Sequence, residues 1–204
     1  MLDRLLNKVL QINPVLMGLL LILLPIVALI INGVVSLILL IAGYKLLFPI
    51  WLLGITMSLS TYFLWIWAVS VKLNNEKLKD LQISTRWFKI AFWLFFSYCA
   101  IHILLSLELD ITSKGFYMDT TLYKTLETIG GIYGLSVLVA YVYLAMFTAR
   151  IIRSLEGGNR LQRVEAIPIT FLIMGFPLGI PLLQARAKNG FELISYMHKK
   201  FPWQ

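Results

Sequence analysis

The sequence has little of three things on which many proteins depend: cysteine, charge and catalytic motifs. A single cysteine, Cys99, excludes an internal disulfide and any zinc site built from several cysteines. Only 14% of the 204 residues are charged, against about 25% in soluble domains, which argues against a water-soluble globule. Paired-histidine metal motifs, G-x-S-x-G nucleophile motifs and phosphate-binding glycine loops are absent. We therefore expect no metal and no cofactor, and the sequence does not favour an enzyme.

The chain has long uncharged apolar runs instead. It is 59% hydrophobic, its mean hydropathy is +0.82, and its charges cluster between the runs, as is typical of a polytopic membrane protein. The run near the N-terminus is much longer than the apolar core of a signal peptide, about 7–15 residues, so we interpret it as a retained span. The predicted fold is all-α, a single domain with four spanning helices, at about 15–44, 47–71, 90–107 and 129–149.

A fifth apolar segment, at about 167–183, is interrupted by four candidate helix breakers: Gly175, Pro177, Gly179 and Pro181. Each proline removes a backbone donor and disfavours helix for the residue before it. Broken backbone at membrane depth is tolerated only where protein or a wet cavity satisfies it, and such segments line binding sites in transporters. We predict a re-entrant or kinked element here, followed by an amphipathic tail at 186–204.

The distribution of charge predicts how the chain crosses the membrane. The segments 72–89 and 150–165 are rich in lysine and arginine, whereas 108–127 is acidic. Because positive flanks favour the cytoplasm, these segments alternate correctly if 15–44 crosses once; a hairpin at Asn32-Gly33 would reverse them and is rejected. The basic tail stays on the same side only if the fifth element re-enters. We predict a multi-pass protein of the bacterial inner membrane with cytoplasmic N- and C-termini.

Four small residues of the fourth segment, Gly130, Gly134, Ala145 and Ala149, share one stripe at about 100° per residue. Small residues on one face let helix backbones approach closely. The stripe indicates either a homo-oligomer interface or packing within the chain.

Cations near the cytoplasmic ends are candidates for binding anionic headgroups or a cytoplasmic protein. They are Arg150, Arg153, Arg160, Arg163, Arg186 and Lys188. The net charge of +8 does not indicate nucleic acid, because no soluble basic domain carries it. A weaker hypothesis concerns Cys99 and His102, three residues apart on one helix face, which would act as nucleophile and base. The plainer interpretation is a neutral histidine bonded to a backbone carbonyl.

Residues 64–189 resemble a family of small polytopic bacterial membrane proteins. In that family a membrane helix ends in Ala, a basic residue and Ser-x-Glu, matched here by Ala149, Arg150, Ser154 and Glu156. A later Phe-Pro-Ile-Gly-Ile-Trp motif running into Gln-Pro-Arg-Ile-Asn is matched by Phe176, Pro177, Gly179, Ile180, Gln184 and Arg186. The chain departs from that motif at Pro181, Ala185 and the displaced Asn189. The resemblance implies a bacterial integral membrane protein and implies no activity.

We expect a non-enzymatic membrane component that works by helix association, as an accessory subunit or an oligomeric permeability effector. In size, span number and basic loops it is similar in type to membrane accessory proteins of bacterial defence loci, including RNA-targeting CRISPR loci. The alternative is a small transporter or lipid-binding membrane protein that uses the broken segment around Pro177. The expected partners are the bilayer with its anionic headgroups and either a second copy or a cytoplasmic protein.

Overall fold

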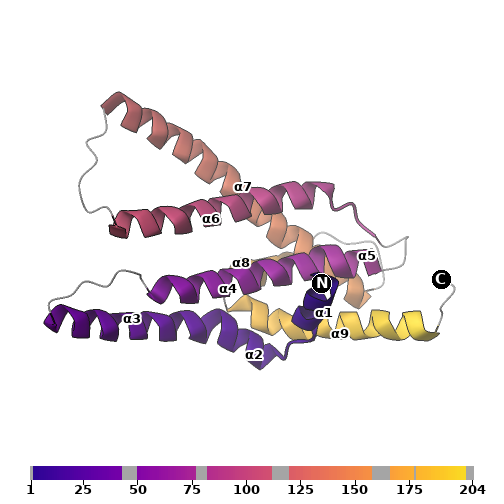
Figure 1. Cartoon of the computed structure of the whole chain (residues 1–204). Helices are drawn as coiled ribbons and strands as arrows, with labels where there is room; N and C mark the ends of the chain where they lie inside the picture. Colours follow the sequence, from indigo (N-terminus) through magenta and orange to yellow (C-terminus); the bar gives the residue numbers. More distant parts are fainter. Residues whose placement is uncertain are drawn as a thin grey trace.

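The computed structural model describes residues 2–42, 50–76, 82–111, 120–157, 166–176 and 178–200, and within these ranges the side chains of 104–129 and 197–200 are not described. All the regular structure in this part of the chain is helical, which confirms the predicted all-α class (Figure 1). The helices are α1 (Leu2–Gln11), α2 (Pro14–Gly18), α3 (Leu24–Ile41), α4 (Ile50–Trp67), α5 (Asn74–Glu76), α6 (Arg86–Ile111), α7 (Thr120–Gly157), α8 (Ile167–Met174) and α9 (Gly179–Lys200). Two π-helical turns, η1 (Leu19–Leu23) and η2 (Ala68–Leu73), continue α2 into α3 and α4 into α5.

Three helices are long and apolar enough to cross a membrane: Pro14–Ile41, Ile50–Glu76 and Gly130–Glu156. They correspond to the predicted segments at 15–44, 47–71 and 129–149. The fourth predicted segment, 90–107, falls on α6, whose side chains are described only as far as Ile103. The lengths and composition of these helices are therefore those of a membrane protein.

The first of these helices runs without a turn through Asn32-Gly33, as the charge pattern predicts. The side chain of Asn13 begins it by accepting a hydrogen bond from the Val15 backbone N–H at 2.9 Å, with a proline at the first helical position. Asn32 serves the neighbouring helix instead: its Oδ1 accepts the Ile50 backbone N–H at 2.8 Å and so caps the start of α4.

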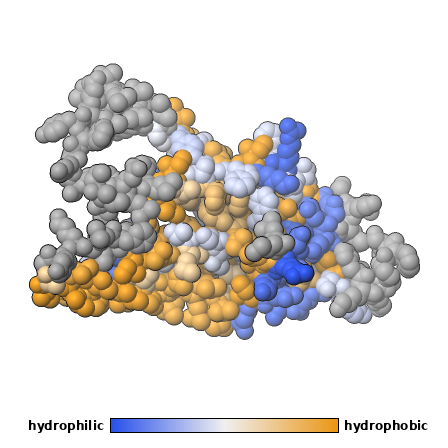
Figure 2. Space-filling model, in the orientation of Figure 1, coloured by the Kyte–Doolittle hydropathy of each residue, from blue (hydrophilic) through white to orange (hydrophobic). Residues whose placement is uncertain are grey.

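Helices α3 and α4 pack closely along one seam. A Cβ on Gly54 would lie 2.5 Å from the Ala28 Cβ and 3.0 Å from the Pro25 Cα, so only glycine allows this approach. Elsewhere α3 touches little, and none of its side chains is buried. Figure 2 shows hydrophobic residues over this part of the molecule, with hydrophilic residues gathered towards the end where α1 lies.

The core is concentrated near that polar end, where α1, α4, α7, α8 and α9 meet. Leu6, Val9 and Leu10 of α1 pack into it. Buried hydroxyl groups join helices across it: the Ser58 Oγ donates to the Leu21 carbonyl at 2.9 Å, and the hydroxyls of Ser70 and Thr148 lie 2.8 Å apart. These buried hydroxyl groups are thus paired within the bundle, as a low-dielectric interior favours.

Candidate functional site: the α8–α9 hairpin and its cavity

Helix α8 runs antiparallel to the second half of α7. At its start, Ala166 lines the same cavity as Arg150; at its end, the Tyr141 hydroxyl donates to the Met174 carbonyl at 3.0 Å. The helix therefore reaches about 13 Å along α7, since nine residues of helix rise by about 1.5 Å each.

Helix α9 returns to the end from which α8 began. The Arg186 Nη1 lies 3.5 Å from the Glu156 Oε1, near the end of α7, and Gly190 packs against Leu155. The two helices form a hairpin that enters and leaves the bundle at the same end (Figure 1).

The predicted break lies between the two helices and depends on glycine. The Gly175 N–H donates to the Phe171 carbonyl at 2.9 Å, and the N–H groups of Leu178 and Gly179 donate back to the Gly175 carbonyl at 3.0 and 3.3 Å. A Cβ on Gly179 would coincide with the Leu172 carbonyl group, so the chain folds back here only because Gly179 has no side chain. Pro177 lies outside the described residues.

Two expectations about this element are corrected. Pro181 lies in the first turn of α9, where its missing N–H has no intrahelical partner to lose, so it starts a helix and does not break one. The tail is not a separate element from residue 186, because α9 is continuous from Gly179 to Lys200. The turn is packed by Phe176, whose ring centroid lies 4.5 Å from that of buried Tyr62 on α4.

Gln184 joins the hairpin to the N-terminal helix and to α4. It is fully buried, and its Nε2 donates to the carbonyls of Val9, Leu10 and Ile12 at 3.0, 3.1 and 2.8 Å. Its Oε1 accepts the indole N–H of Trp65 at 2.6 Å. The amide therefore supplies a donor to carbonyls at and just beyond the C-terminal end of α1, of which the Val9 carbonyl also accepts the Ile12 N–H at 3.3 Å. Sequence reasoning noted Gln184 only within the resemblance; its position as a lone amide in an apolar run was the available signal.

Most of the predicted cations that the structure describes have a carboxylate partner. Glu156 accepts a hydrogen bond from Arg153 at 3.0 Å and also lies beside Arg186, while Lys188 lies 3.9 Å from a Glu192 oxygen. These exposed pairs fasten the polar end only weakly, because solvent screens them. Arg160 and Arg163 lie outside the described residues.

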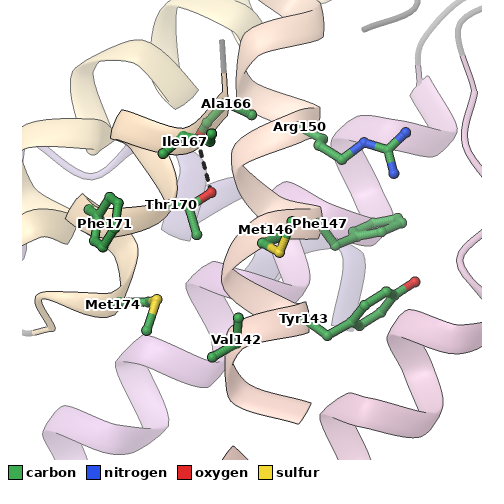
Figure 3. Close-up of a pocket in the computed structure, with 10 residues that line it drawn as sticks. All are labelled: Val142, Tyr143, Met146, Phe147, Arg150, Ala166, Ile167, Thr170, Phe171 and Met174. Carbon is green, nitrogen blue, oxygen red and sulfur yellow. Dashed lines mark hydrogen bonds between the residues drawn. The ribbon is translucent and has the colours of Figure 1, made fainter. Parts of the chain in front are cut away.

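Arg150 differs from these cations. The described part of the chain contains no carboxylate paired with it, and its Nε is buried without a hydrogen-bond partner. It lines a cavity of about 560 Å³ between α7 and α8. The other lining residues are Val142, Tyr143, Met146, Phe147, Ala166, Ile167, Thr170, Phe171 and Met174. Figure 3 shows Tyr143, Phe147 and Arg150 in one row along α7, with the α8 residues on its other side.

No family model, curated protein or solved structure matches this chain. The family resemblance over residues 64–189 therefore stays a prediction. The structure brings its two motif segments together: the ion pair between Arg186 and Glu156 joins the second motif to the first. Ala149 and Ser154, from the first motif, are buried beneath this contact.

The small-residue stripe of α7 divides into two halves. Ala145 and Ala149 are fully buried in the chain's own core. A Cβ on Gly130 or Gly134 would meet no atom of the described residues within 4 Å, so within this part of the structure their face of the helix is open. One half thus packs within the chain, and the other remains available to a neighbour.

Cys99 and His102 lie in different surroundings on α6. Cys99 is half-buried and packs against the core, whereas His102 is exposed, with its ring 4.3 Å from that of Tyr98. Among the described residues no three His, Cys, Asp or Glu side chains are grouped to hold a metal ion. The nucleophile–base hypothesis stays a prediction.

Proposed function

We propose that this chain is a multi-pass inner-membrane protein that works by packing against other membrane helices, as an accessory subunit or as an oligomer that alters permeability. The observation that carries the proposal is the open glycine face of α7. Among the described residues, Gly130, Gly131 and Gly134 have no neighbour within 4 Å of a Cβ, and Leu135 and Leu138 close by are exposed. In Figure 1 the first half of α7 diverges from α6. Glycine surfaces of this kind let two helices approach closely in a bilayer.

The exposure of the first long helix supports a lipid environment. Only 11% of the residues in its most apolar 18-residue stretch are buried, and Leu40 and Ile41 are 72% and 80% exposed. Exposing this apolar surface to water would cost about 25 cal/mol per Å², whereas the hydrocarbon of a bilayer would cover it. With α6 as a fourth span, α8 and α9 form a re-entrant hairpin on the cytoplasmic side, which agrees with the charge pattern.

Replacing both Gly130 and Gly134 by leucine is expected to weaken helix association at least about tenfold, because the side chains hold the partner helix away. The mass of the full chain in detergent, measured by light scattering across a concentration series, tests this. Gly33→Leu is the matched control, since Gly33 also has open space around it but lies on α3. If the unsubstituted chain is strictly monomeric and captures no partner subunit, the proposal is wrong.

The re-entrant hairpin predicts that both termini lie in the cytoplasm. A fluorescent reporter fused after Gln204 should be fluorescent, and alkaline phosphatase fused at the same site should be inactive. The same pair fused after Gly115, in the acidic segment, should give the opposite result. An active phosphatase after Gln204 would instead require a full fifth crossing.

The lipid-binding alternative has one observation in its favour. The break between α8 and α9 is closely packed around Gly179 and Phe176, but an apolar cavity lies beside α8, and it is lined by Arg150, whose Nε has no hydrogen-bond partner among the described residues. A ligand would enter beside the hairpin and not through its turn.

A further inference from the structure

The cavity between α7 and α8 extends from the polar end of the bundle towards its apolar middle. Arg150, Ala166 and Ile167 lie at one end, and Val142 and Met174 lie at the other (Figure 3). The eight helical steps from Val142 to Arg150 correspond to about 12 Å of helix. The volume of about 560 Å³ falls within the range of about 300–1,000 Å³ typical of small-molecule sites.

The walls of this cavity are almost entirely apolar. Met146, Ile167 and Phe171 are all exposed despite lining it, so it opens onto the surface that faces the bilayer. The hydroxyl of Thr170 is occupied, since it donates to the Ala166 carbonyl at 2.9 Å (Figure 3). The cavity therefore offers apolar contact along its length and a cation at its polar end.

We propose that this cavity binds one anionic phospholipid of the bilayer, with an acyl chain along the apolar wall and the phosphate on Arg150. A guanidinium group matches a phosphate through paired N–H donors, and its partly buried position strengthens the contact. Among the residues that the structure describes, no carboxylate pairs with Arg150, whereas Arg153, Arg186 and Lys188 each pair with one. The inference rests on the lipid-binding alternative and does not require helix association.

The test is native mass spectrometry of the full chain in detergent with added phosphatidylglycerol or phosphatidylcholine of identical acyl chains. The unsubstituted chain should bind the anionic lipid at least about tenfold more tightly, because the phosphate of phosphatidylcholine is already neutralised by its own choline cation, which weakens its attraction to Arg150. Arg150→Gln should remove this preference, and Arg150→Lys should retain part of it. Arg153→Gln is the matched control, one turn further along α7, and should keep the full preference.

The cavity itself is tested by Met146→Trp, which fills it and should weaken binding of both lipids equally while leaving Arg150 in place. An unchanged preference in Arg150→Gln, an equal loss in Arg153→Gln, or unaffected binding in Met146→Trp would each overturn the inference. A change in oligomer mass without any effect on lipid binding would assign the cavity to a second copy and also overturn it. The lipid preference should survive in the Gly130→Leu, Gly134→Leu variant, which separates this site from the association face.

Discussion

Gly179→Ala should prevent the α8–α9 hairpin from closing and should destabilise the protein by about 3–5 kcal/mol. A Cβ at this position would coincide with the backbone carbonyl of Leu172, and a backbone group cannot move aside as a side-chain tip can. The chain would have to separate α9 from α8, which would also pull Phe176 from Tyr62. Unfolding of the full chain in mixed detergent, followed by circular dichroism, measures the loss.

Two other glycines provide the controls. A Cβ on Gly175 would lie 3.3 Å from the Phe171 carbonyl, a contact relieved by a small shift, so Gly175→Ala should cost less than Gly179→Ala. Gly33 lies within a helix with open space around it, so Gly33→Ala should be neutral or stabilising by about 0.5–1 kcal/mol. Equal stability of the Gly179→Ala and Gly33→Ala variants would show that the two helices do not meet in this way.

The hydrophobic pattern was sufficient to predict the helices but not how the hairpin closes. Long apolar runs fix helix lengths, and charge at their ends fixes which ends lie together, so the all-α class and the uninterrupted first helix followed from local sequence. The break was expected from Gly175, Pro177, Gly179 and Pro181 together; in the structure Gly179 makes the close approach, and Pro181 lies in the first turn of α9. A close approach depends on what stands opposite, here Leu172, which a local pattern does not reveal.

The N-terminal helix shows a signal that was present but was not used. Leu6, Val9 and Leu10 follow the i, i+3, i+4 spacing of a buried helix face, and all three pack into the core. The segment had been considered only for its charges. The contact of this helix with Gln184 could not be predicted from local sequence, because Gln184 and Leu10 are 174 residues apart.

Gln184→Met is expected to release α1 from the bundle and to cost about 3 kcal/mol or more, although methionine nearly matches glutamine in volume. The substitution leaves the Trp65 indole N–H and the carbonyls of Leu10 and Ile12 without this partner in a buried site, and each unsatisfied buried group costs about 1–3 kcal/mol. These carbonyls lie at and just after the end of α1. They can regain hydrogen bonds only if this end of the helix leaves the bundle and is solvated by water. Hydrogen exchange over residues 2–11 should therefore accelerate more than global unfolding explains.

Trp65→Phe separates the two sides of the Gln184 amide. It removes the indole donor at 2.6 Å but leaves the Nε2 free to hold the carbonyls of Val9, Leu10 and Ile12. We expect a loss of about 1–3 kcal/mol with exchange in α1 unchanged relative to the rest of the core. If neither variant accelerates exchange in α1, the Gln184 side chain acts only by filling space between α4 and α9. If Gln184→Met alone does so, one side chain of the hairpin fixes the position of the N-terminal helix on the bundle.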